Sequence, residues 1–164
     1  MQSDYHNLPL INGTPQKNGR EFAAHSQQYK ATAKTVSYQV DIARAYPQEA
    51  NVKSWIRNYT LHRKKDFTIT DKWKLSACNE PSVLNLMTCC EVEIDRNKNI
   101  TLTGEAGRFK VEYDKKLLSP ATDTVELTDP KLIHSWKRKK LTRIRFTIVS
   151  QQISGESKLV IRKA

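Results

Sequence analysis

The densest group of side chains able to bind a ligand is a run of cations near the C-terminus, directly after Trp136. The run comprises Lys137, Arg138, Lys139, Lys140, Arg143 and Arg145. Arginine offers an oxyanion two parallel N–H donors and lysine supplies a point charge, so this run suits sulfate or carboxylate groups. The alternative interpretation is a hairpin tip and a solvated strand face whose charges oppose edge-to-edge aggregation.

The remaining polar residues show no arrangement typical of a catalytic or metal site. The sequence has no nucleophile elbow, glycine-rich phosphate loop, zinc-finger spacing or paired-histidine helix motif. Its four histidines are scattered. Cys78, Cys89 and Cys90 are odd in number and lack metal-ligand spacing, so we interpret them as free thiols, with a Cys78 bridge to one of the others as the alternative.

Aromatic residues bear on the kind of ligand. Trp55, Trp73 and Trp136 could stack on the apolar faces of pyranose rings, but in a sheet protein core packing is the interpretation that we favour. A nucleic-acid site would need exposed aromatics among its cations. Here the aromatics mostly alternate into the predicted core, so a nucleic-acid partner is not expected.

Charge and composition narrow the class of protein. In 164 residues, 28 Lys and Arg stand against 17 Asp and Glu, which gives a formal charge of +11 and favours a polyanionic partner. The chain is 38% hydrophobic and 27% charged, which predicts a folded domain. It contains neither an apolar run of 18 residues nor a secretory signal at its start, so no membrane partner is expected.

The elements that must position these residues are short strands. Apolar residues recur with a period of two, a hairpin tip is indicated at 64–66, and 131–136 suits one helical turn. The expected strands are 36–42, 55–62, 67–75, 83–94, 100–102, 109–113, 124–127, 143–148 and 158–162. This pattern predicts an all-β fold, an antiparallel β-sandwich of two layers and about ten strands.

The predicted sandwich occupies residues 35–164. Residues 1–34 are polar and rich in turn signals, and we expect them to form a leading loop or edge hairpin of the same domain. Within 55–62, Arg57 shares a face with Trp55 and Tyr59, and Asp71 interrupts the apolar face of 67–75.

Several segments resemble heparinase II/III-like proteins. Residues 2–16 are similar to a family segment in which a His-Asn pair precedes Asn-Gly and Gln. Residues 40–47 and 52–57 resemble its strand, Ala-Tyr-Pro turn and Trp-x-Arg strand, and 127–136 with 143–144 resemble its closing strands. The likeness runs along nearly the whole chain.

The resemblance implies the C-terminal β-sheet region of a polysaccharide lyase whose N-terminal domain is an α/α toroid. Such enzymes cleave uronic-acid glycans by β-elimination, in which a base removes the proton next to the uronate carboxylate and a Tyr or His assists the leaving oxygen. The family's principal base and acid lie outside the matched part. We therefore expect this segment alone to be inactive.

The resemblance also assigns individual residues. His6 matches a histidine that helps to hold a structural zinc, so zinc is expected only in the full-length protein, because a stable site needs three or four ligands. Asn7 would orient its loop, and Arg57 would face the glycan cleft. The implied partners are an acidic polysaccharide and the toroid of the same protein, and the implied location is periplasmic or extracellular.

Three hypotheses remain open at this point. The chain is a scaffold and cleft wall of a lyase, a stand-alone carbohydrate-binding module for acidic glycans, or a nucleic-acid-binding barrel. Salt-sensitive heparin binding fits the second or third, since polyanion binding releases counterions. An unsaturated uronate product absorbing in the ultraviolet would contradict the first.

Overall fold

The computed structural model describes residues 3–164; Met1 and Gln2, which open the predicted leading segment, lie outside the described residues. Two antiparallel sheets make up the structure, with strand orders β1-β6-β11-β10 and β2-β3-β4-β5-β12-β9-β8-β7. The strands are β1 (Pro9–Leu10), β2 (His25–Ala31), β3 (Thr35–Asp41), β4 (Val52–His62), β5 (Asp66–Leu75), β6 (Val83–Thr88), β7 (Glu91–Ile94), β8 (Ile100–Gly104), β9 (Gly107–Tyr113), β10 (Leu118–Glu126), β11 (Lys140–Ile148) and β12 (Ser154–Lys163).

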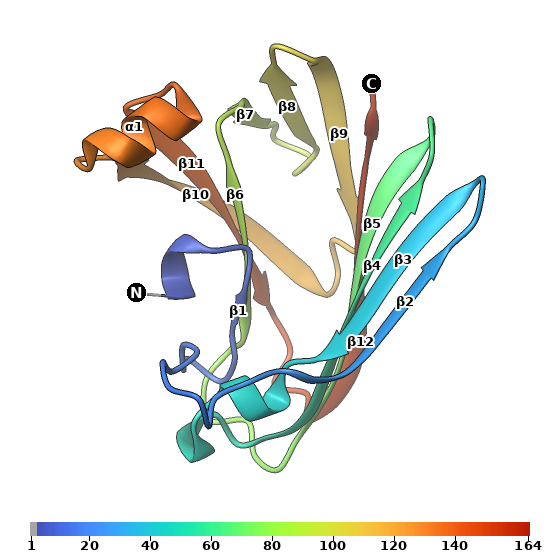
Figure 1. The fold of residues 1–164 in the computed structure, drawn as a ribbon, viewed down its shortest axis with the longest axis vertical. Helices are drawn as coiled ribbons and strands as arrows, with labels where there is room; N and C mark the ends of the chain where they lie inside the picture. The colour runs from blue at the N-terminus through green and yellow to red at the C-terminus, as the bar shows by residue number, and fades with distance from the viewer. Residues whose placement is uncertain (1–2) are drawn as a thin grey trace.

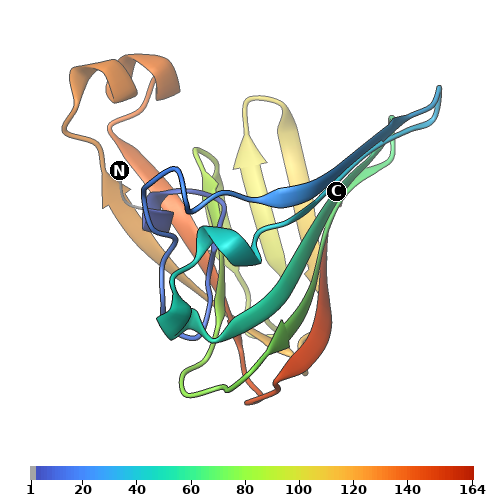
Figure 2. The same ribbon diagram turned by 60° about the horizontal axis from the view of Figure 1, so that its bottom comes forward.

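The two sheets face each other as layers, and neither closes into a barrel (Figure 1). The larger sheet curves, and its hairpins β2–β3 and β4–β5 extend well beyond the smaller sheet (Figures 1 and 2). The predicted two-layer antiparallel β-sandwich is therefore confirmed, with twelve strands in the described residues where about ten were expected.

The predicted long strand over 83–94 is wrong, because the chain bends at Cys89 and Cys90 and changes sheets. β6 lies inside the smaller sheet, whereas β7 forms the edge of the larger one. At the bend, the Cys90 N–H donates to the Thr88 hydroxyl at 3.0 Å, a local bond that competes with continued strand pairing. The other predicted strands are present, but the one expected over 124–127 begins earlier, at Leu118, and the one expected over 158–162 begins at Ser154.

Large apolar side chains fill the space between the layers. The rings of Trp55 and Trp73 stack there with centroids 5.5 Å apart, and Phe146 packs edge-on against Tyr113 at 5.2 Å. The core position expected of tryptophan is confirmed for Trp55 and Trp73. It is wrong for Trp136, whose side chain is 40% exposed.

The exposure of Trp136 follows from the helix that carries it. The predicted helical turn is α1 (Pro130–Trp136), inserted between β10 and β11, and it buries none of its residues. Asp129 caps it by accepting from the Lys131 N–H at 2.8 Å, and Lys137 ends it in the left-handed conformation. Three short 3-10 turns complete the secondary structure, at Ser3–Tyr5, Ala43–Ala45 and Gln48–Ala50.

The leading segment connects to both sheets. β1 pairs with β6 at the edge of the smaller sheet, and β2 forms the outer strand of the larger one. Between them, the buried Asn12 accepts from the backbone N–H groups of Asn79 and Glu80 at 2.7 and 2.8 Å. No helix in the described part of the chain is long and apolar enough to cross a membrane.

Candidate functional site

The predicted basic run begins where α1 ends and continues along β11. Its strand portion alternates as expected: Ile144 and Phe146 are fully buried, while Arg143 and Arg145 lie on the opposite face of the smaller sheet. Lys140 has the same strand parity as Ile144 and leaves the sheet on the other side. The six cations therefore do not share one surface.

Two of these cations pair with carboxylates at the surface. Lys140 Nζ lies 2.8 Å from Glu126, and this hydrogen bond raises the pKa of Lys140. Arg138 lies 3.7 Å from Glu105. Both pairs are solvent-exposed, where water and salt screen the attraction between the two charges, so an anionic ligand can compete with either carboxylate.

Arg143 has more hydrogen-bond partners than Arg138 or Lys140. Its guanidinium makes a fork to the carboxylate of Asp123, with a shortest distance of 2.7 Å, and hydrogen bonding to Asp123 raises the pKa of Arg143. It also donates to the Asp4 carbonyl at 3.0 Å and lies 5.8 Å from the ring centre of Tyr5. Of the run, Lys137, Lys139 and Arg145 have no ion-pair partner among residues 3–164.

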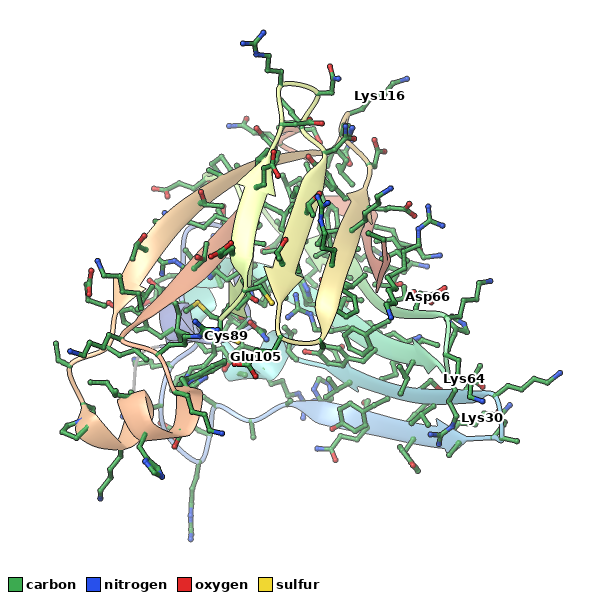
Figure 3. All side chains as sticks on the ribbon, turned by 90° about the horizontal axis from the view of Figure 1, so that it is seen from above. Lys30, Lys64, Asp66, Cys89, Glu105 and Lys116 are labelled. Carbon is green, nitrogen blue, oxygen red and sulfur yellow. The ribbon has the colours of Figure 1, made fainter. Side chains whose placement is uncertain are left out.

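A shallow hollow gathers part of the run. It is lined by Arg138, Lys139, Lys140, Leu141 and Thr142 together with Cys89, Cys90, Glu91 and Thr124. Figure 3 shows Cys89 and Glu105 close together at this end of the molecule, near α1. The three cysteines are free, as interpreted from the sequence. This hollow is the place where the predicted cations come closest to forming a common anion site.

Arg57 lies away from this hollow, inside the sandwich. Its side chain is 3% exposed and forms a bidentate pair with Asp71, while its third donor nitrogen bonds the Asn7 carbonyl at 2.6 Å. Burial lowers the pKa of Arg57, but the adjacent Asp71 carboxylate more than offsets this and leaves the pKa above its ordinary value. In this chain the guanidinium presents no open face to a glycan, so we do not carry Arg57 forward as a contact.

The His6-Asn7 pair occupies the start of the leading segment. His6 is exposed, and residues 3–164 contain no group of three or more metal-ligating side chains that could complete a zinc site around it. Residues 3–164 alone therefore do not make up a zinc site, and a zinc completed by ligands elsewhere in a full-length protein stays a prediction. Asn7 accepts from the Met87 N–H at 2.6 Å, a contact that fixes the loop as the resemblance suggests.

A second group of cations was missed by sequence reasoning. The turns at the ends of hairpins β2–β3 and β4–β5 touch, because the Arg63 N–H donates to the Lys34 carbonyl at 2.9 Å. We call the resulting group the tip cluster. It consists of Lys30, Lys34, Arg63, Lys64 and Lys65. The signal in the sequence was a cation in each of two successive hairpin turns.

The tip cluster carries less compensating charge than the predicted run. The nearest carboxylate along the chain, Asp66, bonds His62 Nδ1 at 2.6 Å, and this hydrogen bond lowers the pKa of Asp66. None of the five cations forms an ion pair in the described structure. In the predicted run, by contrast, three of six cations do.

Solved structures of lyases have a fold similar to that of this chain. No family model matches the sequence, and no curated protein matches it. Among solved structures, the heparan sulfate lyase HepC from Pedobacter heparinus superposes with a TM-score of 0.69 at 11% identity, and a mutant of it with 0.70 at 12%. A heparinase III, the BT4657 gene product, gives a TM-score of 0.70 at 13% identity.

Each match covers 98% of this chain but only 24% of the lyase. This chain thus spans about a quarter of the length of the proteins that it resembles. At such low identity the likeness concerns the fold. The chain therefore folds as the corresponding quarter of a heparinase III-like lyase, the fold that its sequence resemblance predicted.

Proposed function

We propose that this chain is the β-sandwich part of a polysaccharide lyase that cleaves uronic-acid-containing glycans by β-elimination. The supporting observation is that the match in fold covers 98% of the chain and comes from heparan sulfate lyases. In this proposal the chain supplies scaffold and one wall of an acidic-glycan cleft. An N-terminal toroid of the same protein supplies the rest of the cleft and the catalytic groups.

The side chains of the predicted run suit the binding of an acidic glycan. Lys137, Lys139 and Arg145 form no ion pair among residues 3–164, so they are available to attract a carboxylate or sulfate of the glycan. β-Elimination needs a base beside the uronate α-carbon and an acid at the leaving oxygen. The chain therefore contributes electrostatic binding, and the chemistry belongs to the rest of the enzyme.

Heparin binding and lyase activity of this chain test the proposal together. We expect salt-sensitive retention on heparin and no unsaturated uronate in the ultraviolet after incubation with heparan sulfate. Replacing Lys137, Lys139 and Arg145 with glutamine should weaken retention. A matched triple variant of Lys72, Lys74 and Lys158, which lie on the outer face of the larger sheet, controls for net charge.

Two outcomes would contradict the proposal. Formation of unsaturated product by the isolated chain would mean that the catalytic groups are present here. Equal loss of retention in the matched triple variant would mean that heparin retention depends only on net charge.

The proposal also includes a periplasmic or extracellular location and a zinc in the full-length protein. Cell fractionation and metal analysis of that protein test these two parts.

A stand-alone carbohydrate-binding module is the second candidate. The observation favouring it is that cations without carboxylate partners gather in two places, the tip cluster and part of the predicted run, where binding needs no catalytic partner. The coding sequence before Met1 separates the candidates. An open frame encoding a helical toroid supports the lyase, whereas a start codon with nothing before it supports the module.

A further inference from the structure

Three tyrosines form a row across the inner face of the larger sheet. Tyr29 pairs in register with Tyr38, Tyr38 with Tyr59, and Tyr59 with the buried Ile69. Register partners lie on the same face of a sheet, so all three rings are on the side that carries the core. With strands about 4.8 Å apart, the row extends roughly 10 Å.

The row leads out of the core into solvent. Tyr59 is partly buried, stacks on Phe67 with centroids 6.2 Å apart, and has the Arg57 guanidinium 5.9 Å from its ring centre. Tyr38 is 37% exposed and Tyr29 is 70% exposed. The smaller sheet does not reach this part of the larger one, as both ribbon views show (Figures 1 and 2). The outer rings are thus fixed by the sheet but uncovered.

The tip cluster borders this row. Lys30 and Ser37 form the next pair beyond Tyr29 and Tyr38, Ala31 and Val36 form the one after it, and the turn that contains Lys34 follows. At about 3.3 Å per residue, the lysine begins roughly 10–15 Å from the tyrosine pair. Figure 3 shows Lys30 and Lys64 together at this end, far from Cys89 and the predicted basic run. Aromatic faces and unpaired cations therefore lie along one projecting edge.

We propose that this edge is a second binding site for an acidic polysaccharide, with sugar rings stacked on Tyr29 and Tyr38 and carboxylates or sulfates held by the tip cluster. The ligand class rests on the proposed function; the location does not. A pyranose has an apolar face that packs on an aromatic ring, and the tyrosine hydroxyls can bond its polar edge. An anionic chain carries such faces and charges in alternation, which matches a surface that combines both.

The positive charge beside the uncovered tyrosines favours an acidic polysaccharide over a protein partner. Four cations of the tip cluster, Lys34, Arg63, Lys64 and Lys65, lie in the turns beyond this face, whereas Lys30 is on the opposite face of β2. Asp66, the nearest carboxylate along the chain, is already bonded to His62. A protein partner would be expected to bury Tyr29 in an apolar interface with few charges at its centre. A flexible polyanion, in contrast, gains from every unpaired cation because each contact releases counterions.

Calorimetric titration of the chain with a heparin octasaccharide tests the site. Replacing Tyr29 and Tyr38 with alanine should weaken binding about tenfold, whereas replacing both with phenylalanine should change it less than about threefold, since stacking remains. Replacing Lys34 and Lys64 with glutamine should weaken binding and reduce its salt dependence. All four positions are exposed, so the variants should fold normally. The Lys72→Gln, Lys74→Gln double variant, on the outer face of the larger sheet, is the matched control, and a Lys137→Gln, Lys139→Gln double variant tests the predicted run in parallel.

The outcomes separate this inference from the proposed function. If the wild-type chain does not bind heparin, the proposed function fails. If it binds and only the Lys137 and Lys139 variant loses affinity, the proposed function stands and the second site is overturned. If a single-stranded oligonucleotide binds more tightly than heparin and depends equally on Tyr29 and Tyr38, the site is a nucleic-acid site and the inference is also overturned.

Discussion

Arg57 and Asp71 form a bidentate ion pair inside the sandwich, with Nε 2.7 Å from Oδ1 and Nη2 2.8 Å from Oδ2. The two side chains are only 3% and 1% exposed. The Trp55 indole N–H also donates to Asp71 at 2.6 Å, and Arg57 reaches the Asn7 carbonyl. The pair thus ties β4 and β5 to the leading segment and satisfies the polar groups that it buries.

Removing the negative partner should destabilise the fold strongly. Asp71→Asn leaves the Arg57 cation buried without a counter-charge, a change that typically costs about 3–5 kcal/mol. The free energy of unfolding from urea titration measures the effect. Glu126→Gln, which removes the exposed partner of Lys140, is the control and should leave the free energy of unfolding almost unchanged. Similar losses in both variants would contradict the distinction between buried and exposed pairs.

The leading segment depends on Asn12. Its side-chain oxygen accepts from the backbone N–H groups of Asn79 and Glu80, and its own N–H donates to Ser82 at 2.9 Å. Asn12→Ala leaves two part-buried N–H groups unsatisfied, and alanine is less tolerant of its positive φ of 52°. We expect a loss of about 2–4 kcal/mol in urea unfolding. Asn18→Ala, at an exposed position, should have almost no effect on the free energy of unfolding. Comparable losses in the two variants would refute the stabilising role of the Asn12 hydrogen bonds.

The acid side of the stability curve should depend on His62. Its hydrogen bond lowers the pKa of Asp66 below the ordinary 3.8, so the folded state binds that proton less readily than the unfolded state. The resulting stabilisation is present above pH 3.8 and is lost as the pH falls through the folded pKa. In His62→Ala, the pKa of Asp66 should rise toward its ordinary value in a carboxyl NMR titration.

Asp95 is the internal control for that titration. Its pKa is lowered chiefly by hydrogen bonding from Asn99, far from His62 along the chain, so His62→Ala should leave it unchanged. An unchanged Asp66 in the variant, or a parallel shift of Asp95, would show that the His62 contact is not the cause.

Local periodicity was enough to predict much of the fold. Alternation located β3, β4, β5 and β11 and placed Ile144 in the core opposite Arg143, because strand side chains alternate whatever their partners are. The bend between β6 and β7 could not be read in the same way. An uninterrupted, largely apolar run looks alike whether it stays in one sheet or crosses to the other.

The candidate sites were harder to predict, since they depend on register. Asp71 interrupts an apolar face in the sequence, but only the pairing of β4 with β5 brings it opposite Arg57. Likewise, Lys34 and Arg63 become neighbours only when two hairpins pair along their length. The predicted basic run is visible in the sequence. The carboxylates that pair with three of its six cations, Arg138, Lys140 and Arg143, are not, because they come from other strands and turns.

Gly155 should be intolerant of any side chain. It pairs with Trp73 across β12 and β5, and a Cβ atom there would overlap the indole ring, which is itself stacked on Trp55. Because the two indoles lie in a packed core, Gly155→Ala should force a shift that costs about 1–3 kcal/mol. Urea unfolding followed by tryptophan fluorescence measures both the stability and the indole environment.

A double-mutant cycle isolates the cause. In a Trp73→Leu background the ring that blocks the new methyl group is gone, so Gly155→Ala should cost at least about 1 kcal/mol less than in the wild type. Ser154→Ala, one residue earlier and exposed, controls for general changes in β12. An equal cost of Gly155→Ala in both backgrounds would assign the loss to the strand backbone, because the clash would then contribute nothing.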